Sequence, residues 1–326
     1  MALLCVLVIA LAKLSLRVVE RPFRDRAFIG RKPVAIACAA GSVLFVAIGI
    51  AGIVSDGFER GYLMTLDQRQ AKVWLASIDK ANDNGCKFPT SEINAEIETR
   101  FNRCAGQYGR ALVILGDSHG IDMYQAISLN LPYPFIVGLV QGGCRPATPD
   151  PDCHLDSFRS FIKSHDKQIS KVLYNQAGFN LLKVDETGSY IIDQSRIKLT
   201  LDYIDSIANT VSLVWLGPSV EPDHNVKLVR KLAMSCTTAD VTTNIALDDA
   251  LKRLDHQLGV LVSSTSRISY FSVIDALNFD RQVNIYDCDA IYWTDGDHWS
   301  LAGEKRFGDR IVKKMNEERV VAAPSQ

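Results

Sequence analysis

The most constraining feature of this sequence is a stretch of 22 residues without a charge, from Pro33 to Val54. About 20 apolar residues let a helix cross the hydrocarbon core of a bilayer. The glycines and alanines of this stretch also suit close helix packing in lipid. We therefore expect a transmembrane helix over residues 33–55. The rest of the 326-residue chain is then divided between what precedes this anchor and a folded domain that follows it.

A second apolar stretch lies before it, from Met1 to Leu16, with Lys13 as its charged residue. It lacks the basic n-region of a signal peptide, so we favour a truncated spanning helix over a cleaved signal. The loop between the two stretches holds six basic and two acidic residues. By the positive-inside rule this loop is cytoplasmic, and the chain after residue 55 lies outside the cytoplasm.

Cysteine usage agrees with an exported domain. Cys5 and Cys38 lie in the two apolar stretches, and six more follow. An even number of cysteines outside the cytoplasm favours disulfides, although six cysteines allow many pairings. The alternative, a metal site, is disfavoured because the cysteines form no C-x-x-C pair and no histidine has ligand spacing, so no metal is expected. We expect the local pairs Cys86–Cys104, Cys144–Cys153 and Cys236–Cys288.

After residue 109 short apolar runs alternate with helical segments. The runs predict strands buried on both faces, because such strands lose the polar alternation. They cover residues 111–115, 135–140, 171–174, 211–216 and 268–274, with helices near 119–130, 155–168, 195–209, 225–234, 243–260 and 301–316. This alternation implies an α/β fold with a parallel sheet covered by helices on both faces.

The remaining segments complete the domain organisation. Residues 56–109 are interpreted as a connector between the anchor and the α/β domain, which takes residues 110–326. The net charge of −1 argues against nucleic acid as a partner, since domains that bind phosphate backbones carry a basic excess or stripe.

The first catalytic signal is Gly116-Asp117-Ser118-His119, directly after the first of these strands. A serine at a strand-to-helix turn exposes its hydroxyl at the edge of the sheet. The N–H groups of the following helix then face developing negative charge. The structural alternative is a plain helix cap formed by Asp117 or Ser118.

The second signal is the run from Asp295 to His298, before the last helix. The spacing of three lets the Asp295 carboxylate reach Nδ1 of the imidazole, which leaves Nε2 to take a proton from a serine. Asp297 is a competing orienter, but we favour Asp295 because adjacent side chains usually diverge. His119 either lines the pocket or lies on the helix surface.

Together these motifs resemble the SGNH hydrolase family, whose first block is Gly-Asp-Ser and whose last is Asp-x-x-His. The resemblance covers residues 110–316 and implies a flavodoxin-like sheet with Ser118, Asp295 and His298 as the catalytic triad. It also implies an oxyanion hole made by the Ser118 N–H, a glycine after the second strand and an asparagine after the third. The usual Gly-x-Asn-Asp of that third block is missing here. The candidates are Gly143, with Gly142 as the alternative, and Asn175, with Asn180 as the alternative.

A second resemblance concerns residues 19–24, Val-Glu-Arg-Pro-Phe-Arg, which look like the end of the acyltransferase family 3 membrane domain. Residues 1–32 would then be a remnant of its last transmembrane helix and a cytoplasmic loop. Fused members of that family continue with one more spanning helix, a connector and a periplasmic SGNH domain, and they O-acetylate surface polysaccharides such as lipopolysaccharide O-antigen. The resemblance implies a bacterial inner-membrane protein whose SGNH-like domain lies in the periplasm.

The same resemblance implies the substrates and partners. No tightly bound cofactor is expected, and the acyl donor, an acetyl group that comes ultimately from acetyl-CoA, is a substrate. The expected partners are the lipid bilayer, a surface glycan acceptor and a separate acyltransferase family 3 membrane domain. That last partner is expected because most of this membrane domain is absent from the sequence.

Three functions stay open from the sequence. The favoured one is a polysaccharide O-acyltransferase that works through an acyl-enzyme. A carbohydrate esterase or deacetylase would use the same triad and differ only in admitting water to the acyl-enzyme. A non-catalytic glycan-binding partner of a membrane acyltransferase would tolerate loss of Ser118, and the intact triad argues against it.

Overall fold

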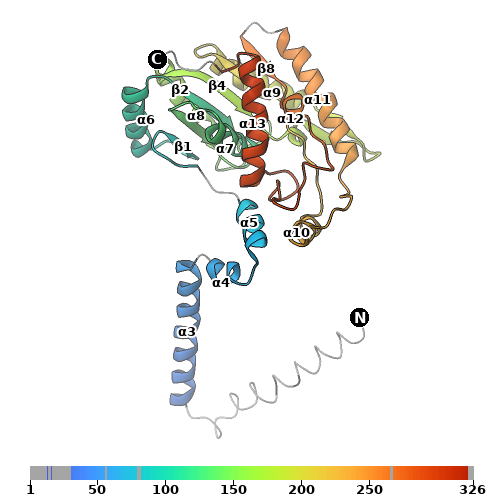
Figure 1. Ribbon diagram of the computed structural model, residues 1–326. Coiled ribbons are helices and arrows are strands. Elements are labelled where there is room, and N and C mark those ends of the chain that lie inside the picture. Colours follow the sequence, from blue (N-terminus) through green and yellow to red (C-terminus); the bar gives the residue numbers. More distant parts are fainter. Residues whose placement is uncertain are drawn as a thin grey trace. The chain divides into compact units, whose positions relative to one another are not determined.

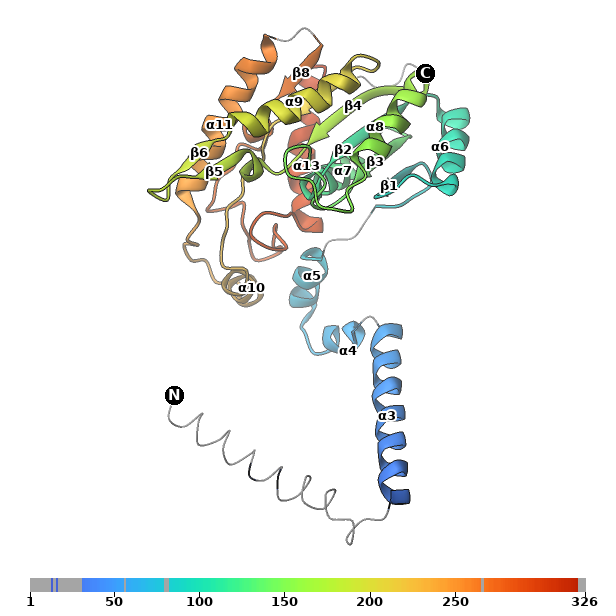
Figure 2. The same cartoon turned by 180° about the vertical axis from the view of Figure 1, so that it is seen from behind.

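The computed structural model describes residues 13, 16, 31–55, 57–78, 82–264 and 267–321 (Figures 1 and 2). The chain divides into two compact units, residues 1–67 and residues 68–326. They are described here one after the other.

The first unit contains the long helix α3 (Arg31–Val54) and the short helix α4 (Glu59–Leu63). Within the part of the chain that the structure describes, one helix is long and apolar enough to span a membrane, Ala35–Val54 in α3. Its large side chains are exposed, with Phe45 at 76% and Ile53 at 79%. A helix that is apolar on all sides and exposes those sides is suited to lipid. The other predicted span, residues 1–16, falls almost wholly outside the described residues, so a second transmembrane helix stays a prediction.

The second unit is built on a six-stranded sheet in which every pair of neighbouring strands is parallel (Figure 1). The strand order is β1-β3-β2-β4-β7-β8. Apart from the edge strand β1, this is the order of flavodoxin-like doubly wound sheets, with the switch point at β2. The strands are β1 (Lys87–Thr90), β2 (Ala111–Gly116), β3 (Ile136–Val140), β4 (Ile169–Asn175), β7 (Leu213–Leu216) and β8 (Ile268–Phe271).

Helices cover both faces of the sheet, as predicted. Figure 1 shows α7 and α13 in front of the strands, and Figure 2 shows α8 and α9 in front of them from behind. On β2, Val113 and Leu115 belong to one core cluster, and Leu112 and Ile114 belong to the other. The apolar run of this strand is continuous because both of its faces are buried. The first cluster packs on α6 (Ala95–Tyr108), α8 (Leu155–Ser164), α9 (Gln194–Ala208) and α11 (Ile245–Ser263), and the second on α7 (Ser118–Asn130), α10 (Val226–Ser235), α12 (Val273–Leu277) and α13 (Leu301–Glu317).

The structure adds further elements to the predicted alternation of strands and helices after residue 109. Strand β1 and helix α6 lie within the segment interpreted as a connector, where β1 extends the sheet by pairing with β3. Strands β5 (Leu182–Val184) and β6 (Tyr190–Ile192) form a small antiparallel hairpin. The remaining elements are α5 (Gln68–Ala76) and two 3-10 helices, Asp166–Gln168 and Gly178–Leu181.

All three predicted disulfides are present, and each fastens a different part of the second unit. They are Cys86–Cys104, which ties the start of β1 to α6, Cys144–Cys153, which closes the loop after β3, and Cys236–Cys288, which ties the end of α10 to the segment before the Asp295 turn. Among the described residues the one free cysteine is Cys38, which is exposed on α3. The disulfide prediction is therefore confirmed.

Candidate active site

The first half of the site is the turn between β2 and α7. Strand β2 ends at Gly116, Asp117 caps α7, and Ser118 is the first residue of that helix. A side chain at Gly116 would place its Cβ 1.9 Å from the backbone oxygen of Asn175, so only glycine fits there. The Asp117 carboxylate is fully buried and accepts the N–H groups of His119 at 3.0 Å and Ala177 at 3.2 Å. The partly buried Ser118 thus sits at a helix N-terminus, whose dipole favours negative charge.

The second half is the turn before α13. The Asp295 carboxylate lies 3.0 Å from Nδ1 of His298 and also accepts the backbone N–H groups of Asp297 and His298 at 3.0 and 2.8 Å. Nε2 of His298 is buried and has no hydrogen-bond partner among the described residues. It is therefore not hydrogen-bonded to the Ser118 hydroxyl in this structure. Catalytic hydrogen bonds often tighten only when substrate binds.

Two contacts bring the turns together at the carboxyl end of the sheet. The Trp299 N–H donates to Asp122 on α7 at 3.0 Å. The ring centroids of His119, which follows Ser118, and of His298 lie 5.2 Å apart. The sequence motifs are 180 positions apart, and the structure makes them neighbours.

Asp297 has a larger part than the sequence predicted. Its Oδ1 lies 3.2 Å from Nδ1 of His298, and its Oδ2 lies 3.3 Å from Nε2 of His119. The adjacent side chains do not diverge, because the turn folds both carboxylates toward one imidazole. His119 is buried, not on the surface, and its Nδ1 lies 3.3 Å from the Ser219 hydroxyl. No sequence spacing links His119 to Asp297, so the motifs alone did not reveal this contact.

These contacts set the charges of the site. Hydrogen bonds with Asp295 and Asp297 hold the pKa of His298 well above its usual value. Burial opposes ionisation of both carboxyls but is outweighed, so the pKa of each is lowered. For Asp295 the His298 imidazole and the backbone N–H groups of Asp297 and His298 act together, and for Asp297 the imidazoles of His119 and His298 do so. Burial alone would lower the pKa of His119, yet its bond to Asp297 and the charge of Glu221 raise it to about 9. The site therefore favours a protonated His298, which must lose that proton before it can act as a base.

The predicted oxyanion residues lie at the ends of β3 and β4 or in the loops that follow, and they differ in their hydrogen bonds. Gly143 adopts a φ of 73°. Any other residue there would place its Cβ 1.8 Å from the Asp150 carboxylate, so the missing side chain leaves room for Asp150. Asn175 ends β4 beside Gly116, but its Nδ2 donates to the backbone oxygens of Leu216 and Gly217, each at 3.2 Å. The alternative Asn180 is buried, and its Nδ2 has no hydrogen-bond partner among the described residues. The amide of Asn175 is thus partly committed to β7.

His119, Asp297 and His298 offer ligand atoms within 4.8 Å of one another, which is close enough for a metal ion. Their hydrogen bonds to each other account for the same arrangement, because both imidazoles are paired with Asp297. We assign no metal to this cluster.

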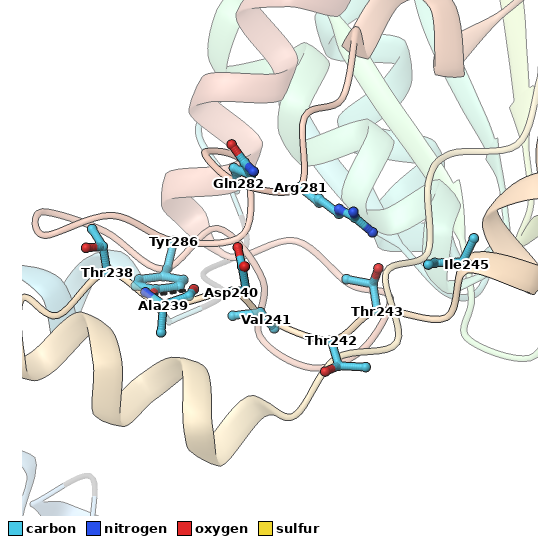
Figure 3. Close-up of a pocket in the computed structure, with 10 residues that line it drawn as sticks. All are labelled: Thr238, Ala239, Asp240, Val241, Thr242, Thr243, Ile245, Arg281, Gln282 and Tyr286. Carbon is cyan, nitrogen blue, oxygen red and sulfur yellow. Dashed lines mark hydrogen bonds between the residues drawn. The ribbon is translucent and has the colours of Figure 1, made fainter.

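A hollow of about 700 Å³ lies elsewhere (Figure 3). In it the side chain of Arg281 extends toward Thr243, and Tyr286 lies against Ala239. Its lining residues include neither of the two turns.

Comparisons with known proteins identify the family of the chain. A model of the family described as "SGNH domain (fused to AT3 domains)" matches residues 85–313. None of the curated proteins matches the chain.

Among solved structures, the periplasmic domain of a lipopolysaccharide acetyltransferase from Salmonella ser. Paratyphi A is 18% identical, with a TM-score of 0.49, covering 71% of this chain and 90% of that one. The carbohydrate acetylesterase Est24 from Sinorhizobium meliloti is 12% identical, with a TM-score of 0.40 and coverages of 64% and 99%. The C-terminal catalytic domain of peptidoglycan O-acetyltransferase A from Streptococcus pneumoniae is 9% identical, with a TM-score of 0.35 and coverages of 67% and 98%. Because the family match spans most of the chain and includes both turns, this chain belongs to the family of SGNH domains that are fused to AT3 domains, and it is an enzyme of the SGNH type.

Proposed function

We propose that this chain is an O-acyltransferase that moves an acetyl group onto a hydroxyl of a cell-surface polysaccharide. The observation that carries the acyl-enzyme chemistry is the state of His298, and the family description, which names fusion to AT3 domains, favours transfer over hydrolysis. Nδ1 of His298 is held by Asp295, while its Nε2 is buried, without a partner among the described residues, in a turn that packs against the helix beginning at Ser118. A serine nucleophile needs an imidazole oriented in this way, and the Ser118 hydroxyl would come within reach of Nε2 when substrate binds.

The proposed reaction has two steps. Ser118 Oγ attacks the acyl carbonyl carbon while His298 Nε2 takes the serine proton and then passes it to the leaving group. The resulting acyl-enzyme is attacked by a sugar hydroxyl, whose proton goes to His298 and then back to Ser118 as the new ester leaves. The backbone N–H groups of Ser118 and Gly143, with Asn175, are the proposed donors to the oxyanion. Asp295 orients the imidazole and stabilises its charged form.

The proposed setting is the outer side of a bacterial inner membrane. Helix α3 has the length and exposed apolar surface of a membrane anchor, and three disulfides in the second unit suit an oxidising compartment. The family description names fusion to AT3 domains, which supports a membrane acyltransferase domain as the partner that supplies acetyl groups, ultimately from acetyl-CoA.

The test uses the full chain with its disulfides formed. We expect Ser118-dependent turnover of p-nitrophenyl acetate, and acetylation of added glycans. Ser118→Ala should abolish turnover, because it removes the proposed nucleophile. Ser157→Ala, at an exposed position on α8, is the matched control and should have no effect. Turnover that survives in Ser118→Ala would refute the assigned nucleophile.

A further inference from the structure

A smaller pocket, of about 250 Å³, lies beside the catalytic turn. Two of its lining residues, Phe179 and Asp297, are close in sequence to residues of the candidate active site. Asp297 precedes His298, and Phe179 follows Ala177, whose N–H is held by the Asp117 carboxylate next to Ser118. The pocket is lined by Phe179, Tyr190, Glu221, Asp223, Leu247, Gly296 and Asp297.

The pocket is held in shape by hydrogen bonds at its rim. The Glu221 carboxylate accepts the N–H groups of Gly178 and Phe179, at 2.9 and 3.3 Å, which fixes the loop after β4. The N–H of Asp223 donates to the Gly296 oxygen at 2.8 Å, and this joins the loop after β7 to the catalytic turn. Three separate segments therefore meet around one preformed hollow.

The lining combines an aromatic surface with hydrogen-bond acceptors. The Phe179 side chain is 42% exposed, which is high for a large apolar group in a folded domain, so its ring has a face free to pack against a ligand. Sugars offer an apolar C–H face and hydroxyl donors, and they bind where a ring can cover the face and carboxylates accept the hydroxyls. The volume lies below the roughly 300–1,000 Å³ of sites for drug-sized ligands, so one monosaccharide ring is the expected occupant.

The charge of the lining is one-sided. Of the described residues, the seven around this pocket include three carboxylates and neither lysine nor arginine. Two imidazoles with raised pKa values, those of His119 and His298, contact this lining, and both are already paired with Asp297. Burial raises the pKa of Glu221 to about 7, so this carboxyl is mostly ionised above neutral pH. A second negative charge brought into such a site is repelled and loses its hydration.

We infer that this pocket holds the acceptor as a single sugar ring without negative charge, stacked on Phe179, and that it rejects acidic sugars. The inference rests on the proposed function, and it names the class of acceptor that the sequence left open. Asp223 and Asp297 would accept hydroxyls of the bound sugar, and they would exclude a uronic acid at the same position.

The charge is tested with two acceptors that differ in little else. Methyl glucuronoside and its uncharged amide both lack the C6 hydroxyl, so only the negative charge separates them. With the full chain, p-nitrophenyl acetate as donor and pH 8, we expect the amide to be acetylated at least about tenfold faster than the acid, because like charges brought together cost several kcal/mol. Equal rates, or a faster acid, would overturn the inference.

Two variants locate the effect. Asp223→Asn keeps the oxygen that accepts from Asn244, and asparagine tolerates the φ of 44° at this position. It should bring the amide-to-acid ratio severalfold closer to one. Phe179→Ala should lower the ratio of acetyl transfer to hydrolysis about threefold to tenfold, by loss of one aromatic contact. Tyr108→Ala, at an aromatic residue of similar exposure on α6, is the control and should leave the ratio unchanged.

The outcomes separate this inference from the function it rests on. Ser118-dependent hydrolysis with no charge preference would overturn the acceptor pocket and leave the nucleophile in place. If every variant still hydrolysed the ester, Ser118→Ala included, the proposed function itself would be contradicted. Ratios that do not respond to Phe179→Ala would show that the acceptor binds elsewhere.

Discussion

The two turns that build the site are held in opposite ways. The turn at Ser118 is fixed by packing, because Gly116 lies against the backbone of Asn175 and Asp117 is completely buried. The turn at His298 is fixed by charge. Its carboxylates keep part of their surface in solvent and bond to imidazoles and to the N–H groups of their own turn. Sterics thus position the proposed nucleophile, and electrostatics position the proposed base and raise its pKa.

The strongest way to break the charged turn is Asp295→Asn. The amide can keep the backbone contacts but favours the wrong tautomer of His298, so we expect kcat to fall about a thousandfold to ten-thousandfold. Ester hydrolysis by the full chain measures this. Asp156→Asn, at an exposed carboxylate of α8, is the control. A loss of less than tenfold, with a large loss in Asp297→Asn instead, would make Asp297 the principal orienter.

The packed turn is broken by Gly116→Ala. The added methyl meets a backbone oxygen that cannot move freely, so we expect a loss of about 1–3 kcal/mol in the free energy of unfolding, typical of overpacking. Urea denaturation measures it. Gly106→Ala is the matched control, because this helical glycine has open space around its Cβ position and alanine favours helices. Equal stabilities of the two variants would contradict the steric account.

The finest test of the comparison is the pH dependence of Asp297→Asn. Activity needs neutral His298, so activity rises as the pH increases through the pKa of that imidazole. Asp295, Asp297 and Asp122 raise this pKa, whereas burial and the nearby His119 cation oppose the rise. Removing one carboxylate lowers this pKa, and the rising limb of kcat/KM should move about one pH unit lower. Gly116→Ala should leave the limb where it is. A limb that moves in Gly116→Ala but not in Asp297→Asn would reverse the roles assigned to the two turns.

Much of the fold could be predicted because its strands are buried on both faces. The apolar run of β2, flanked by a glycine and a serine turn, identifies a central strand from sequence alone. Strand β1 could not be identified in this way. It has four residues, it contains Pro89, and it lies at the edge, where proline is tolerated and the apolar signal is weak. The hairpin of β5 and β6 was missed for a similar reason, since its strands have three residues each.

The candidate site likewise has residues that could be predicted from the sequence and contacts that could not. Ser118, Asp295 and His298 could be proposed because their local spacing already carries the geometry that each needs. The contact between His119 and Asp297 joins residues 178 positions apart, so it depends on how α7 packs against α13. The same is true of Asn175, whose amide turns toward β7 for reasons that lie in the neighbouring strand.

The disulfide Cys144–Cys153 gives this enzyme a point of maturation. It closes a loop of nine positions directly after Gly143, and such a closure contributes roughly 2–3 kcal/mol by restricting the open chain. In a reducing compartment the loop would lack that restraint, and the proposed oxyanion donor would be less firmly held. If Gly143 donates to the oxyanion as proposed, the chain would reach full activity only after this bond forms.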